Sequence, residues 1–312
     1  EKESLMTPPQ LLIVGSIGLD TIETPRATVE RVLGGAAVFA ASAACRFAAP
    51  AVVGVVGDDF PPEHGALLRG QGVDLTCVDK KPGKTFFWHG RYEEDMNNRV
   101  TLDTQLGVFG EFAPRIDPPY DRIATVFLAN IHPQLQLDVL DAMRGSPLTA
   151  MDSMNYWIRT TPDLLKKVIA RVSLFFVNDE EARMLTNRQS IRSAADALLS
   201  MGPEWVVIKR GDAGAGLFTR DAEFFVPAIP LRQVVDPTGA GDTFAGGMMG
   251  YLARRGGRSF AVMKQAAVAG TVMASFCVED FSLNRLACLG KQDIVERIGR
   301  IRDLCAFDPL DF

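Results

Sequence analysis

The segment 236–247 reads Asp-Pro-Thr-Gly-Ala-Gly-Asp-Thr-Phe-Ala-Gly-Gly and constrains this chain more than any other stretch. It follows an irregular stretch, 227–235, that contains two prolines, and it leads into a pattern that places Phe244, Met248 and Leu252 on one helical face. A glycine-rich loop therefore runs directly into the N-terminus of a helix. Such a terminus has free N–H groups and a partial positive charge, so it binds anions.

The residues of this segment suit phosphate chemistry. Gly239 and Gly241 let the backbone approach a phosphate that a side chain would block. Asp242 stands where the loop becomes helix, where the helix dipole favours the ionised carboxylate, so it can accept a proton from a substrate hydroxyl. An anion site beside a positioned base is what phosphoryl transfer to an alcohol requires. The alternative is that Asp242 is only a helix N-cap and the glycines only a tight turn.

The complete run, Asp-x-Thr-Gly-Ala-Gly-Asp-x-Phe-x-Gly-Gly, resembles the C-terminal signature of the ribokinase-like (PfkB) carbohydrate kinase family. The other common phosphate motifs do not fit. The chain has no Gly-x-x-x-x-Gly-Lys-Ser/Thr, and Phe244 stands where the dinucleotide-binding Gly-x-Gly-x-x-Gly would need its third glycine.

The resemblance implies a fold and a reaction. The fold would be a single α/β domain over residues 1–312, with a mostly parallel central sheet, helices on both faces and a small β lid made of segments near 20–33 and 84–104. The reaction would move the γ-phosphoryl of ATP, with Mg²⁺, to a hydroxyl of a sugar or sugar-like molecule. Asp242 would be the base, the N–H groups of Gly239, Ala240 and Gly241 the anion hole, and Thr238 a nucleotide contact.

Composition limits the other classes of function. In 312 residues, 47% are hydrophobic and 23% charged, which predicts a large buried core. A net charge of −5 without a basic block argues against a nucleic-acid partner. There is no long uninterrupted apolar run, so we predict no membrane span, and residues 1–9 lack a signal-peptide core. We interpret the five scattered cysteines as reduced, mostly buried thiols of a cytoplasmic protein.

Short apolar runs alternate with helical patterns along much of the chain, which predicts right-handed βαβ units and a parallel sheet covered on both faces. The expected strands cover residues 11–14, 51–56, 126–129, 148–151, 174–177 and 205–208, and the expected helices cover 36–47, 134–143, 163–171, 260–276 and 292–304.

The acceptor site is expected after the first strand, because ligands of open α/β sheets bind at the carboxyl ends of strands. Asp20 lies in the loop expected there and could hydrogen-bond substrate hydroxyls; alternatively it satisfies its own turn. The resembled family has a sugar-binding Asp at this place. Gly34-Gly35 before an alanine-rich helix resembles the family's Gly-Gly-x-x-x-Asn, in which the glycines and Asn contact substrate; here Phe39 replaces the Asn.

The lid segments are the least determined part. Residues 21–32 form either a loop or an exposed two-stranded ribbon, and 84–92 is expected to pair with 100–102. Phe86, Phe87 and Trp88 could cover the substrate, form a homodimer through exposed sheet faces, or pack in a core hairpin.

Two further motifs suggest a nucleotide site. Asn178-x-x-Glu181 has the form of a helix capping box, and the resemblance implies that it also serves Mg²⁺ and phosphates through water. Lys209-Arg210-Gly211-x-x-Gly214 has the form of a hairpin turn, and it resembles the family's nucleotide-edge loop. In that role Lys209 or Arg210 would offset phosphate charge.

The acceptor is left open among several classes, with free sugars and sugar acids ahead of nucleosides, and nucleosides ahead of sugar phosphates. Phe39, Trp88 and Trp157 could stack on a nucleoside base, and Arg91 could bind an acidic or phosphorylated acceptor. The alternative for all four is packing in the core or lid. Two other classes of protein remain possible, a ligand-binding regulator that has lost turnover and a purely structural subunit.

Overall fold

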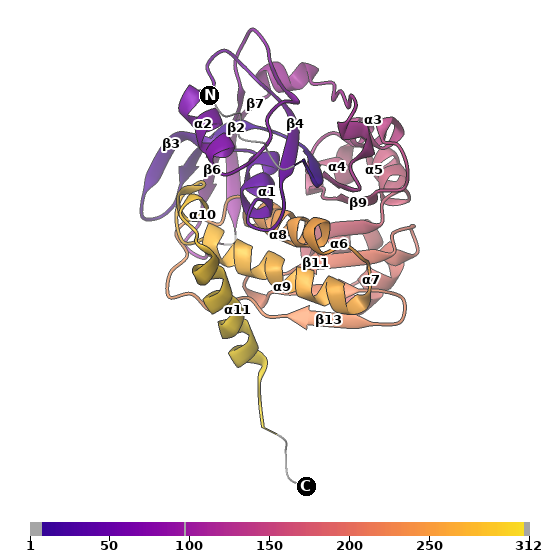
Figure 1. Ribbon diagram of the computed structural model, residues 1–312. Helices are drawn as coiled ribbons and strands as arrows, with labels where there is room; N and C mark the ends of the chain where they lie inside the picture. The colour runs from indigo at the N-terminus through magenta and orange to yellow at the C-terminus, as the bar shows by residue number, and fades with distance from the viewer. Residues whose placement is uncertain (1–7, 97, 309–312) are drawn as a thin grey trace.

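The computed structural model describes residues 8–96 and 98–308. A nine-stranded sheet forms its centre (Figure 1), and all six predicted strands belong to it. In spatial order the strands are β13 (Glu223–Val226), β12 (Ala215–Phe218), β11 (Trp205–Lys209), β10 (Leu174–Asn178), β9 (Leu148–Met151), β8 (Thr125–Leu128), β1 (Leu11–Val14), β4 (Pro50–Val56) and β5 (Val78–Lys80). The strands from β11 to β5 pair in parallel, and β11, β12 and β13 pair antiparallel.

Helices cover both faces of this sheet, as its alternating side chains require. In β1, Leu11 and Ile13 belong to one hydrophobic core and Leu12 and Val14 to the other. The first core is closed by α1 (Ala36–Ala44), α2 (Pro62–Gly70), α8 (Ala240–Arg255), α9 (Phe260–Cys277), α10 (Asn284–Ala287) and α11 (Lys291–Cys305). The second is closed by α3 (Pro133–Ala142), α5 (Pro162–Ile169), α6 (Asp179–Thr186) and α7 (Ile191–Leu199). The result is the predicted α/β architecture with a largely parallel sheet.

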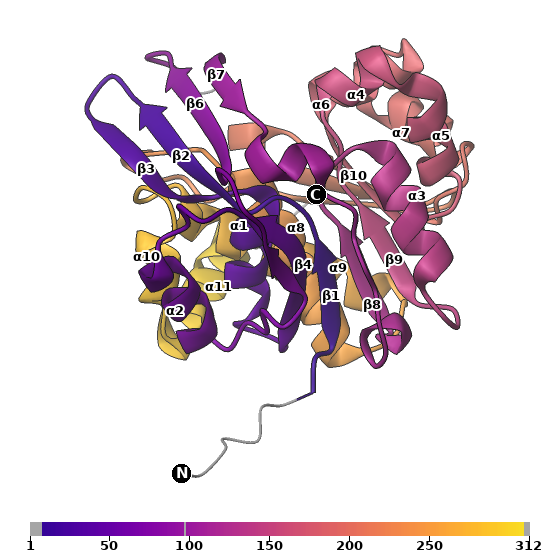
Figure 2. The same cartoon turned by 90° about the horizontal axis from the view of Figure 1, so that it is seen from above.

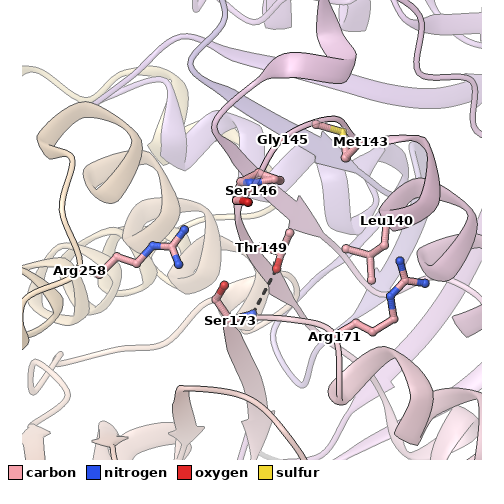
Figure 3. A pocket seen from close by; sticks show the side chains of 9 residues that line it. Leu140, Met143, Gly145, Ser146, Thr149, Arg171, Ser173 and Arg258 are labelled. Carbon is pink, nitrogen blue, oxygen red and sulfur yellow. Dashed lines mark hydrogen bonds between the residues drawn. The ribbon is translucent and has the colours of Figure 1, made fainter.

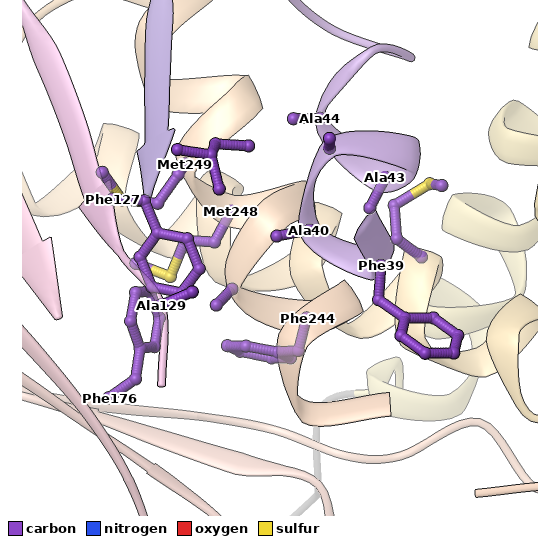
Figure 4. Packing of buried hydrophobic residues seen from close by; sticks show 14 of the residues in the cluster. Phe39, Ala40, Ala43, Ala44, Phe127, Ala129, Phe176, Phe244, Met248 and Met249 are labelled. Atoms are coloured by element: carbon purple, nitrogen blue, oxygen red, sulfur yellow. The ribbon is translucent and has the colours of Figure 1, made fainter. Parts of the chain in front are cut away.

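Small residues bring α1 and α8 into close backbone contact (Figure 4). A Cβ added to Gly246 would lie 2.1 Å from the carbonyl oxygen of Ala40, and one added to Gly250 would lie 2.7 Å from Cα of Ala44. Glycine at both positions is therefore required by space, not by backbone freedom. This contact fixes the start of α8 relative to the start of α1, which positions the two segments singled out in the sequence.

A second sheet of four strands stands beside the first, and Figure 2 shows it projecting from the edge where β1 ends. We call it the small sheet; its order is β3 (Thr28–Gly34), β2 (Gly18–Glu23), β6 (Phe86–Tyr92) and β7 (Arg99–Gln105). The predicted ribbon and the predicted pairing of 84–92 with 100–102 are both confirmed. One expectation was wrong: Asp20 lies in strand β2, not in a loop.

Two further predictions from the sequence concern membrane-spanning segments and the cysteines. Among the described residues, α9 alone is long and apolar enough to cross a membrane by length and composition, but 61% of it is buried within the fold, as in a core helix. All five cysteines are free. Only Cys277 is buried, while Cys288 and Cys305 are exposed, so the expectation of mostly buried thiols was wrong.

Candidate active site

Several of the predicted site residues gather at the carboxyl edge of the main sheet. β1 lies between β4 and β8, so the direction of the chain order reverses there, and a crevice for ligands is expected at such a switch point. Asp20 follows β1, Asp152 follows β9, and Lys209 ends β11. The pocket in Figure 3, with Thr149 and Ser173 in its wall, lies instead at the amino ends of β9 and β10, away from these groups.

The loop before α8 is held by its own residues. Gly239 is the N-cap of α8 and has a left-handed φ of 74°, which favours glycine. A Cβ at this position would also lie 2.3 Å from the ring of Phe39. The side chain of Asp236 accepts a hydrogen bond of 2.8 Å from the N–H of Thr238. The loop backbone is therefore fixed before any ligand arrives, as an anion hole requires.

Asp242 is the third residue of α8 and not its cap, since Gly239 is the N-cap and no side chain caps this helix. The capping alternative therefore does not account for it. Burial, followed by the charge of Asp152, raises the pKa of Asp242 to about 6, while Lys209 and Arg99 oppose the rise. From the sequence we expected the helix dipole to favour the ionised carboxylate, but in the structure burial raises its pKa. A pKa near 6 still leaves the carboxylate mostly ionised at pH 7, and such a value suits a general base.

Lys209 places a positive charge beside the loop. Its Nζ forms an ion pair with Asp152 and lies 3.1 Å from the point that a Cβ on Gly241 would occupy. Burial would lower the pKa of Lys209, but Asp152 and Glu181 outweigh burial and raise it, so the ammonium keeps its proton. An anion bound at the start of α8 would therefore contact the backbone N–H groups of the helix and also the ammonium of Lys209.

Asn178 and Glu181 form the capping box that the sequence predicts. The Glu181 N–H donates to Oδ1 of Asn178 at 2.8 Å, and the Asn178 N–H donates to Oε2 of Glu181 at 3.0 Å. Burial, followed by the charge of Asp152, raises the pKa of Glu181 to about 7. The box leaves a buried carboxylate facing the same cluster of charges, so the capping role does not exclude a second role toward a cation.

Between β11 and β12, the predicted nucleotide-edge loop is a short, ordered turn. Gly211 and Gly214 have φ values of 55° and 88°, and the Arg210 N–H donates to the Gly214 carbonyl at 2.8 Å. A Cβ on Gly214 would lie 2.1 Å from the Val226 carbonyl oxygen, so the hairpin itself needs this glycine.

On the acceptor side, Asp20 is 4% exposed and sits in a strand, so it is not a turn aspartate. Burial, followed by the charges of Asp236 and Asp242, raises the pKa of Asp20 to about 8, and a hydrogen bond from the Gly35 N–H opposes this. Gly34 leaves room for the carboxylate, because a Cβ there would lie 2.0 Å from Oδ2 of Asp20. Asp20, Gly34 and Gly35 thus form one unit near Asp242.

Comparison with known proteins shows the family to which the chain belongs. A sequence profile described as pfkB family carbohydrate kinase matches residues 139–286. The cytidine kinase of Thermococcus kodakarensis is 33% identical over 251 residues, which are 78% of this chain and 88% of that enzyme. The chain belongs to the pfkB family of carbohydrate kinases. It is accordingly a phosphotransferase with an alcohol group as acceptor.

Solved structures of other kinases share the fold. The nucleoside kinase of Methanocaldococcus jannaschii has a TM-score of 0.74 at 20% identity, covering 93% of this chain and 98% of that chain. Arabidopsis thaliana ribokinase, solved with ribose and ATP, has a TM-score of 0.74 at 20% identity, covering 94% of this chain and 99% of that chain. The predicted ribokinase-like architecture is confirmed.

The profile match divides the pfkB site into two parts. Residues 139–286 contain Asp152, Glu181, Lys209 and Asp242, which form the charged cluster around the loop. Asp20 and the small sheet lie outside the match. The family match therefore covers the charged cluster and does not extend to Asp20 or the small sheet.

Two residues expected to contact the acceptor are placed elsewhere. Phe39 is 1% exposed and its ring lies against Gly239, so it supports the loop before α8 from the core (Figure 4). Arg91 forms an ion pair with Glu23, its neighbour in the β2–β6 pairing. Because successive side chains of a strand face opposite sides, Arg91 lies on the face of the small sheet opposite that of Tyr92. We correct both expectations: Phe39 packs, and Arg91 is held on the outer face.

The face of the small sheet that contains Asp20 also holds Trp88, which the sequence singled out, and Tyr92, which it did not. Trp88 pairs with Asp20 across β2 and β6, so the two side chains lie next to each other. Tyr92 is buried, and its hydroxyl lies 3.1 Å from Oγ1 of Thr238. Asp152 was also missed, although it follows a predicted strand at the edge where Asn178 follows another. Trp157, the remaining aromatic candidate, donates from Nε1 to Oδ1 of Asn130 at 2.9 Å.

Proposed function

We propose that this protein is an ATP- and Mg²⁺-dependent kinase of a nucleoside, with Asp242 as the general base. The observation that carries the proposal is the arrangement of Asp20 and Trp88 side by side, facing the phosphate loop from the small sheet. A ribose with a planar base attached matches a carboxylate beside an indole. The relatives named cytidine kinase and nucleoside kinase support the same acceptor class.

On the phosphate side, each residue has a proposed task. The N–H groups of Gly239, Ala240 and Gly241, with the ammonium of Lys209, bind the phosphoryl group that is transferred. Thr238 completes the loop, and Gly211 and Gly214 shape the neighbouring edge for the rest of the nucleotide. Each donor is already fixed, so no reorganisation is needed when charge develops.

A metal would enter beside this loop. Among residues 8–96 and 98–308, no group of three or more His, Cys, Asp or Glu side chains could hold a metal ion directly. Asn178 and Glu181 would hold Mg²⁺ through water, as a buried carboxylate with a raised pKa gains from a nearby cation. When bound, Mg²⁺ neutralises phosphate charge.

On the acceptor side, Asp20 and the N–H of Gly35 orient the hydroxyls of the sugar, and Asp242 takes the proton from the hydroxyl that attacks. Trp88 stacks on the base, a contact that contributes about 1–3 kcal/mol in nucleic-acid sites. The small sheet, residues 20–33 and 84–104, acts as the lid that excludes water during transfer. We place the enzyme in the cytoplasm, where ATP is available.

The proposal is tested by a coupled ADP-release screen over ketoses, aldoses, sugar acids, nucleosides and sugar phosphates. Turnover should be highest with a nucleoside. Trp88→Leu should then raise KM for the nucleoside while leaving KM for ATP unchanged. A free sugar with higher kcat/KM than every nucleoside would contradict the acceptor assignment but keep the kinase. Absence of turnover with every acceptor, although ATP raises Tm, would contradict the kinase itself.

A further inference from the structure

Arg99 is the first residue of β7, and it pairs with Tyr92 in the β6–β7 ladder. Cross-strand partners share a face, so Arg99 lies on the face of the small sheet that contains Tyr92 and Asp20. Its positive charge lowers the pKa of Tyr92 against the effect of burial, and the Tyr92 hydroxyl lies 3.1 Å from Oγ1 of Thr238. A chain of contacts therefore leads from the edge of the small sheet to the phosphate loop.

The guanidinium of Arg99 is also held from a second side. Its Cζ lies 5.8 Å from the centroid of the Trp88 ring, within the range of a cation–π contact. The Trp88 Nε1 donates to Oγ1 of Thr101, the residue two positions after Arg99. Trp88 and Tyr92 together orient the guanidinium, although the arginine as a whole is exposed.

The charge of Arg99 is not neutralised by a neighbour. No carboxylate of the described residues lies within 4.0 Å of its guanidinium, whereas Arg91, on the opposite face, is paired with Glu23. Its charge instead acts on the site, since it lowers the pKa of Asp242 against the effect of burial. A cation held near a base and a phosphate loop, without a carboxylate partner, has an anion as its natural ligand.

We propose that Arg99 is a catalytic residue of the small sheet, whose guanidinium binds the phosphoryl group during its transfer to the acceptor. This inference rests on the proposed kinase function. Lys209 reaches the phosphate from the main sheet, and Arg99 reaches it from the small sheet. The positive charge around the phosphate is complete only when the small sheet stands over the site. The site is therefore ready for phosphoryl transfer only when the small sheet is in place.

The test compares Arg99→Met, which removes the charge and keeps an apolar stem, with Arg99→Lys, which keeps the charge. Arg26→Met is the matched control, because Arg26 is an exposed arginine in the β2–β3 turn of the same sheet. For each variant, kcat, KM for ATP, KM for the best acceptor and Tm are measured. Tyr92→Phe, which removes the hydroxyl between Arg99 and Thr238, is measured beside them.

Arg99→Met should lower kcat by roughly 10²-fold, the scale of losing one preorganised donor to a developing charge. KM for ATP and Tm should change little, and Arg99→Lys should recover part of kcat. Tyr92→Phe should lower kcat by a smaller factor, and Arg26→Met should match the wild type. Because Arg99 lowers the pKa of Asp242, Arg99→Met should also move the acidic limb of the kcat profile to higher pH.

Wild-type kcat in both Arg99 variants, with an unmoved acidic limb, would overturn the inference and leave the kinase function intact; Arg99 would then only pack on Trp88. Equal losses of kcat in Arg99→Met and Arg26→Met would also overturn it, since any charge on the sheet would then act alike. If the wild type phosphorylates no acceptor, the proposed function and this inference both fall. Should Arg99→Met fail to fold, Arg99→Lys and Tyr92→Phe decide the matter: a lower kcat in both supports the role of Arg99, and a wild-type kcat in both overturns it.

Discussion

Replacing Asp20 with Asn should stabilise the protein and disable it. The pKa of Asp20 is about 8 in the folded protein against 3.8 for an ordinary aspartate. Between these two pH values the folded state binds a proton that the unfolded state has lost, so stability falls as pH rises from about 4 to about 8. One pKa unit corresponds to about 1.4 kcal/mol, so the ionised carboxylate costs of the order of 5 kcal/mol at pH 8.

Asn cannot ionise, yet its side-chain oxygen can still accept the hydrogen bond from the Gly35 N–H. The free energy of unfolding of Asp20→Asn, measured with urea from pH 5 to pH 8, should therefore exceed that of the wild type by a margin that widens with pH. KM for the acceptor should rise, because the carboxylate that destabilises the fold is also the group proposed to orient the hydroxyls of the substrate. Asp303→Asn, which removes an exposed carboxylate from α11, is the control and should parallel the wild type. A constant difference between Asp20→Asn and the wild type across this pH range would refute the reasoning.

Three further outcomes are expected. Glu181→Gln should raise the Mg²⁺ concentration needed for half-maximal turnover with little change in Tm, because Gln also serves in a capping box; a lower Tm with unchanged Mg²⁺ dependence would leave only the capping role. Because the pKa of Asp242 is about 6 and the base must be ionised, kcat should fall as pH drops below about 6, and a flat kcat profile from pH 5 to 8 would contradict this. Light scattering should give a dimer formed through the small sheet, whose edge strand β7 exposes Val100 and Leu102; a monomeric mass at assay concentrations would refute it.

The sequence predicted most of the fold because parallel strands buried on both faces are continuous apolar runs. Segments such as 11–14 and 148–151 can be predicted as strands from their own residues alone, and their predicted bounds were correct. Asp20 was misplaced in a loop because β2 belongs to the small sheet, where polar and apolar residues mix and no run marks the strand. Tertiary pairing with β6, not local pattern, makes this segment a strand.

The site could be predicted where its residues lie together in one short segment of the sequence. The glycines and Asp242 lie within a few residues of each other, so their chemistry can be inferred without the fold. Asp152 and Tyr92 could not be found in this way, because their roles depend on contacts with Lys209 and Thr238 that only the fold creates. Phe39 was misassigned for the same reason: its position in a motif indicated substrate, while packing against Gly239 fixed its role.

The role of Asp242 as general base is the central claim, and Asp242→Asn tests it most directly. Gly239 and not Asp242 caps α8, so the variant should keep the wild-type Tm and its affinity for ATP. Its kcat with the best acceptor should fall by roughly 10²-fold or more, the usual scale for loss of a general base. If Asp242→Asn turns over that acceptor within about threefold of the wild type, Asp242 is not the base and the proposed mechanism is wrong.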